Sequence, residues 1–156
     1  MRRLLALAAA AAAITGAGCS SEDEGTPEAC LAPASAYRDA LEDAPGPVAL
    51  DGAIPVSGCL PPGQGAADLA QVGQAMVEAA TQLNGAARRD PGGGGAVALG
   101  YLVGAAQKGA SATGGIHADL LRRLDAAAQF SPGGKPLPAG FERGYAKGYT
   151  AGLETG

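Results

Sequence analysis

The stretch from Asp68 to Phe130 constrains the fold most, because its residue patterns are those of helices that can build a core. It contains three consecutive segments that we expect to be helical, at residues 68–88, 95–108 and 115–130. The first has an apolar residue at every third or fourth position, the spacing of a helix with one buried face. The second is apolar on all sides but too short to span a membrane, which favours a buried central helix. The sequence therefore predicts a mainly α fold, a small bundle of four to five helices.

The composition limits the chain to one small domain with a core of thin side chains. The 156 residues include 26 glycines and no tryptophan. Small side chains bury little apolar area each, so neighbouring backbones must approach closely to pack without voids. The formal net charge is −4, and removal of Arg2 and Arg3 with a signal peptide would bring it to about −6. An acidic chain without basic clusters is not expected to bind nucleic acid.

The N-terminus has the pattern of an export signal. A basic start is followed by an unbroken apolar run at residues 4–14, which ends in Thr15-Gly16-Ala17-Gly18-Cys19. Small residues before a cysteine resemble the lipobox of bacterial lipoproteins. This resemblance implies that the signal peptide, residues 1–18, is removed and that Cys19 carries acyl chains such as palmitate, which anchor the protein to the outer face of the bacterial cell membrane. The alternative is an ordinary signal cleaved after Ala17, which would give a secreted protein.

Two cysteines remain once Cys19 is assigned to the lipid. Residues 19–28 are small, polar or acidic, and we expect them to form a disordered, lipid-anchored tether. In an oxidising compartment, Cys30 and Cys59 are expected to form a disulfide bond. Closing a loop of this length would stabilise the fold by roughly 3–4 kcal/mol. The alternative is a pair of free, buried thiols.

The segment between these cysteines is expected to form a flap over the helices, pinned by the disulfide. Residues 35–43 predict a short helix, because the segment begins with a capping serine and places Tyr37 and Leu41 on one face. The Asp51-Gly52 pair between two apolar runs predicts a hairpin turn. In chain order, the predicted single domain at 29–156 comprises a flap at 29–62, core helices at 66–130 and a C-terminal helix at 139–153.

The C-terminal helix contains a glycine at every fourth position, and a large apolar residue follows each glycine from Gly140 to Gly152. On such a helix, one row of positions has no side chains, and the row beside it is mostly aromatic. This arrangement suits close packing against another helix. Glycine lowers helix propensity by about 1 kcal/mol per residue, so this helix should form only when it is docked. The docking surface is either the chain's own bundle, which we favour, or a partner protein. The predicted interaction face consists of Phe141, Gly144, Tyr145, Gly148, Tyr149 and Gly152.

The sequence contains no recognisable catalytic, metal-binding or nucleotide-binding motif. A dinucleotide-binding loop follows a β-strand, but no strand is predicted before the glycine run at 92–95. His117 is the only histidine, and no metal or cofactor is expected. These observations favour a surface-anchored envelope lipoprotein that acts as a non-catalytic binding or scaffolding module. The alternative is an envelope enzyme that uses scattered carboxylates, such as Asp68 or Asp119, with His117 or Tyr101.

Overall fold

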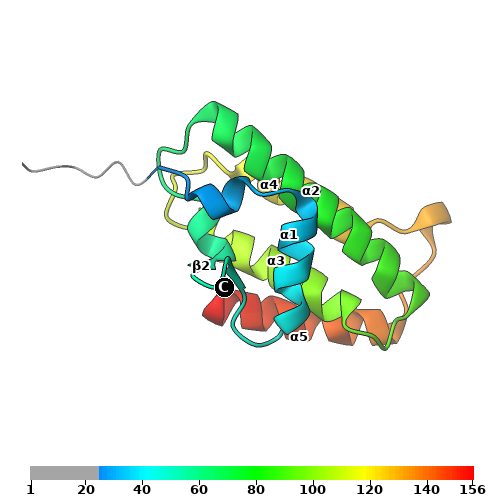
Figure 1. Ribbon diagram of the computed structural model, residues 1–156. Coiled ribbons are helices and arrows are strands. Elements are labelled where there is room, and N and C mark those ends of the chain that lie inside the picture. Colours follow the sequence, from blue (N-terminus) through cyan, green and yellow to red (C-terminus); the bar gives the residue numbers. More distant parts are fainter. Residues whose placement is uncertain (1–24) are drawn as a thin grey trace, which may run out of the picture.

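The structure, a computed structural model, describes residues 25–156. This part of the chain is mainly helical, with five α-helices and a disulfide in its N-terminal region (Figure 1). The predicted small helical bundle with a disulfide-pinned flap is therefore confirmed. The signal segment, Cys19 and most of the predicted tether lie outside the described residues.

Helix α3, Gly95–Ala110, lies at the centre of the bundle. Helices α2, Ala66–Arg89, and α4, Ala118–Gln129, pack on it and on each other, while α5, Ala139–Thr155, runs along its other side (Figure 1). Most side chains of α3 are buried, as expected for a helix that is apolar on all sides. Within residues 25–156, no helix combines the length and the apolar character needed to cross a bilayer.

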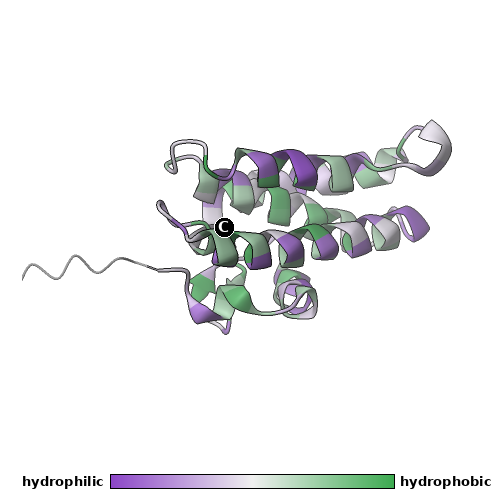
Figure 2. Cartoon of the chain, turned by 90° about the horizontal axis from the view of Figure 1, so that it is seen from above, coloured by the Kyte–Doolittle hydropathy of each residue, from purple (hydrophilic) through white to green (hydrophobic). Residues whose placement is uncertain are grey.

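The other long helices each bury one face. On α2, Val72, Met76 and Ala79 are buried, whereas Gln74 and Glu78 are exposed, as the apolar spacing predicts. Hydrophilic and hydrophobic residues accordingly alternate along the ribbons (Figure 2).

Helix α4 begins at Ala118, three residues later than predicted. Gly114 and Gly115 have φ angles of 64° and 91°, which are incompatible with a right-handed helix. Ile116 is therefore outside the helix and 43% exposed, although the sequence pattern placed it on the apolar face. After α4, a short 3₁₀ turn, η4, at Pro132–Gly134 precedes α5.

The N-terminal flap consists of short elements that cover α2 and α3. In chain order these are η1 (Glu28–Leu31), α1 (Ala34–Ala40), η2 (Leu41–Asp43), β1 (Ala49–Leu50), β2 (Ile54–Pro55) and η3 (Val56–Cys59). The two strands pair antiparallel, and Asp51 and Gly52 take positive φ angles in the turn between them, as the hairpin prediction requires. The disulfide joins the first and the last of these elements, with 5.3 Å between the Cα atoms of Cys30 and Cys59. The predicted disulfide is therefore confirmed.

Candidate functional sites

The glycine ridge of the C-terminal helix packs against α3 of the same chain. A β-carbon at Gly148 would lie 2.8 Å from the amide nitrogen of Tyr101, and closer still to the carbonyl oxygen of Val97. Glycines of α3 are equally close to α5, since a β-carbon at Gly100 would lie 2.8 Å from the amide nitrogen of Tyr149. The two backbones thus meet directly, with glycines on both sides of the contact. This surface of α5 is occupied by its own bundle.

The aromatic ridge beside these glycines forms a stack along α5. The ring centroids of Phe141 and Tyr145 are 6.4 Å apart, and those of Tyr145 and Tyr149 are 6.1 Å apart, with nearly parallel planes. Phe141 is only 2% exposed, and the two tyrosines are half-buried. Burial, together with the nearby carboxylate of Asp125 and the Tyr149 phenol, raises the pKa of Tyr145 to about 12. Of the predicted interaction face, Gly144, Tyr145 and Tyr149 are partly open to solvent, whereas Phe141, Gly148 and Gly152 are buried.

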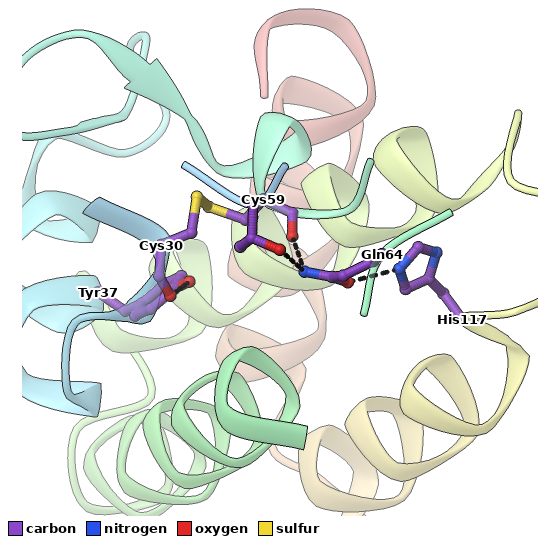
Figure 3. Close-up of a disulfide and its surroundings, with 6 residues drawn as sticks. Cys30, Tyr37, Cys59, Gln64 and His117 are labelled. Carbon is purple, nitrogen blue, oxygen red and sulfur yellow. Dashed lines mark hydrogen bonds between the residues drawn. A yellow bond between two sulfur atoms is a disulfide. The ribbon is translucent and has the colours of Figure 1, made fainter. Parts of the chain in front are cut away.

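His117 is fully buried and both of its ring nitrogens are hydrogen-bonded. The side-chain amide nitrogen of Gln64 donates to the carbonyl oxygen of Cys59, so the amide oxygen of Gln64 faces His117 (Figure 3). His117 Nε2 must therefore carry a proton and donate to that oxygen at 2.8 Å. Nδ1 lies 2.9 Å from the hydroxyl of Thr113. Burial lowers the pKa of His117, and the ring joins the end of the flap to the start of α4.

The other residues of the enzyme hypothesis lie in separate places. The hydroxyl of Tyr101 accepts a hydrogen bond from the backbone amide of Val48 at 3.1 Å and contacts Thr155 at 2.9 Å. Asp119 pairs with Arg122 on the exposed surface of α4, at 2.7 Å. Asp68 lies in the first turn of α2. None of these three side chains hydrogen-bonds to His117, whose ring nitrogens bond to Thr113 and Gln64 instead.

Among residues 25–156, no group of three or more His, Cys, Asp or Glu side chains is placed to hold a metal ion.

A surface groove of about 680 Å³ lies between the flap and the ends of α2 and α3. Its floor is apolar and includes Leu41, Leu83 and Ala98, which are between 1% and 8% exposed. Charged side chains line it above that floor: Arg38 and Glu42 from the flap, and Arg89 from the last turn of α2. The volume of the groove falls within the range of small-molecule sites, which is roughly 300–1,000 Å³.

The two arginines of the groove form no ion pair within the described residues. The one ion pair found within residues 25–156 joins Arg122 to Asp119. Arg38 instead donates a hydrogen bond to the side-chain oxygen of Gln82 at 2.6 Å, across the gap between α1 and α2. A guanidinium group has five N–H donors, so most of its donors stay free for a ligand. The sequence interpretation missed this groove, because Arg38 lies in the predicted short helix at 35–43 and Arg89 lies just after the predicted helix at 68–88, far apart in the chain.

The fold and the groove together define a small, disulfide-bonded helical bundle with a candidate ligand site on its surface. Comparison of the chain with protein-family models, with curated proteins and with solved structures found no match. Its function is therefore inferred from its own residues.

Proposed function

We propose that this chain is a surface-anchored lipoprotein of the bacterial cell envelope that binds a small ligand without transforming it. The groove between α1, α2 and α3 carries this proposal. It is wide enough for a small organic molecule, and its apolar floor supplies the hydrophobic contact area that such ligands need. Neither His117 nor Tyr101, the proton-transfer candidates of the enzyme hypothesis, lines this groove.

The export part of the proposal is supported by the N-terminal sequence and by the disulfide. Paired cysteines are typical of proteins outside the cytoplasm, where thiols are not kept reduced. The bond between Cys30 and Cys59 fits the destination that the lipobox-like segment ending at Cys19 indicates.

The anchor can be tested by cell fractionation. The Cys19→Ala variant should move from the membrane fraction to the medium, or remain as an uncleaved precursor, because it lacks the cysteine of the lipobox-like segment that would carry the acyl chains. The matched control is Ser20→Ala, which keeps the cysteine and should stay in the membrane fraction. Unchanged membrane association of the Cys19→Ala variant would contradict the lipoprotein assignment.

Ligand binding can be tested with the lipid-free chain that Cys19→Ala provides, and with two probes of one shape, 2-naphthoate and 2-naphthamide. We expect calorimetry to detect binding of at least one probe. The Ala86→Phe change, which places a ring in the groove, should abolish this binding, whereas Ala70→Phe on the exposed face of α2 should not. Circular dichroism checks that both variants fold, and Ala86→Leu replaces Ala86→Phe if the larger ring prevents folding. Binding of neither probe, or binding that survives the filled groove, would refute the site.

A further inference from the structure

We infer that the ligand of the groove is a small organic acid, whose apolar body lies on the floor and whose carboxylate binds between Arg38 and Arg89. This inference rests on the proposed function, since it names the class of ligand for the same groove. Guanidinium groups bind carboxylates through paired hydrogen bonds, and they lose less hydration free energy on burial than an ammonium group does.

The charge of the groove is opposite to that of the protein. The chain contains 15 acidic and 11 basic residues, yet the groove lining contains two arginines and one glutamate. Both arginines are exposed, and neither forms an ion pair within the described residues. Two unpaired cations beside an apolar floor are arranged for an anion with a hydrophobic body.

The arginines, rather than the helix ends, set the sign of this charge. The last turn of α2 and the first turn of α3 both border the groove, at Arg89 and at Gly95. The C-terminal end of a helix carries a partial negative charge and the N-terminal end a partial positive charge, so the two ends oppose each other here. The charged side chains that line the groove are Arg38 and Arg89, with Glu42 opposing them.

Glu42 makes a specific test possible. It lies four residues after Arg38 but forms no ion pair with it, and it borders the groove. A bound carboxylate would be repelled by Glu42, whereas a neutral ligand of the same shape would not. Replacing Glu42 with Gln should therefore strengthen the binding of an acid and leave the binding of its amide unchanged.

The experiment compares 2-naphthoate with 2-naphthamide on the lipid-free full chain by calorimetry. We expect the naphthoate to bind about tenfold more tightly than the amide, and this preference should shrink as salt is added. Arg38→Gln and Arg89→Gln should each weaken naphthoate binding by roughly five- to tenfold and leave the amide unaffected. Arg123→Gln, an exposed arginine of α4 outside the groove, is the matched control. Glu42→Gln should raise the naphthoate affinity by roughly twofold or more.

The outcomes separate this inference from the proposed function. If both probes bind equally and both are blocked by Ala86→Phe, the groove is a ligand site but not an acid site, and the inference is overturned. Inorganic phosphate has no apolar body. If phosphate at equal concentration displaces the naphthoate, the arginines bind any anion, and the inference that the ligand is an organic acid is overturned. If neither probe binds, the proposed function fails together with the inference.

Discussion

The contact between α3 and α5 predicts a large cost for the smallest possible side chain at Gly148. Alanine adds one methyl group, which would lie 2.8 Å from the amide nitrogen of Tyr101 and closer to the carbonyl oxygen of Val97. β-carbons essentially never come within 3.0 Å of a non-bonded heavy atom from another part of the chain. Both neighbouring atoms belong to the backbone of α3, so neither can rotate away, and the two helices must move apart.

The free energy of this change can be worked out from two opposing terms. Alanine is a better helix former than glycine by about 1 kcal/mol, which favours the variant. Inserting a methyl group into a closely packed contact typically costs 1–3 kcal/mol, and more where the backbone must move. Separation of the helices also weakens the close approach at the glycines of α3, Gly100 and Gly104, because they share the contact. We therefore expect Gly148→Ala to lower the free energy of unfolding by about 2 kcal/mol.

Thermal unfolding of the purified chain, followed by circular dichroism, measures this effect. A loss of about 2 kcal/mol should lower the melting temperature by roughly 6–10 °C in a domain of this size. Gly85→Ala is the matched control, because Gly85 is also in a helix but a β-carbon there would meet only the end of the Arg89 side chain, at 3.5 Å. That variant should be stabilised by roughly 0.5–1 kcal/mol.

A Gly148→Ala variant as stable as the wild type would refute the reasoning, since it would show that α5 does not pack backbone to backbone on α3. If such a variant also lost a partner protein in a pull-down, the glycine ridge would be an intermolecular surface. The two results therefore separate the two docking surfaces that the glycine repeat allows.

Three further predictions concern the flap and the buried polar groups. Replacing both Cys30 and Cys59 with Ala should lower the free energy of unfolding by roughly 2–5 kcal/mol in urea titrations. Tyr101→Phe should cost about 1–3 kcal/mol in the same assay, because a buried backbone amide loses its acceptor, and an unchanged midpoint would argue against that hydrogen bond. Stability should fall as the pH drops below about 6.5, because burial lowers the pKa of His117 and only the unfolded chain gains the proton readily. His117→Gln should flatten this pH dependence, and an equal slope in the variant would contradict the assignment.

The helices were predictable from the sequence because their signals are local. Apolar spacing located α2 and α3 to within two residues at each end, and glycine spacing located α5. The start of α4 was misplaced because the sequence does not show that Gly114 and Gly115 adopt left-handed conformations. A glycine within an apolar pattern fits either a helix or a turn, and the tertiary fold decides between them.

The role of the glycine repeat could be predicted only in part. The spacing at Gly144, Gly148 and Gly152 shows that one face of α5 can approach another backbone closely, but it does not show which backbone. The matching glycines of α3, Gly100 and Gly104, lie about 40 residues earlier in the chain. Their interlocking with α5 depends on the relative register of the two helices, which no local pattern specifies.

The candidate groove was not predictable, because no single stretch of sequence contains it. Arg38 and Arg89 belong to different elements, and each has an ordinary role when its own segment is considered alone. An arginine in a short helix is solvated, and an arginine at a helix C-terminus stabilises the last carbonyl groups. The site exists only because the flap folds back over α2.

The disulfide connects the proposed site to the proposed location of the protein. Arg38 and Glu42 lie inside the loop that Cys30 and Cys59 close, whereas Arg89 lies outside it on α2. The position of one wall of the groove relative to the other therefore depends on how firmly the flap is held against the bundle. Buried contacts of the flap contribute to this, but the disulfide removes much of the freedom that the unfolded loop would otherwise have. A chain kept reduced in a cytoplasm would lack this constraint, so the proposed export would help to hold the flap wall of the groove, with Arg38, against α2, with Arg89.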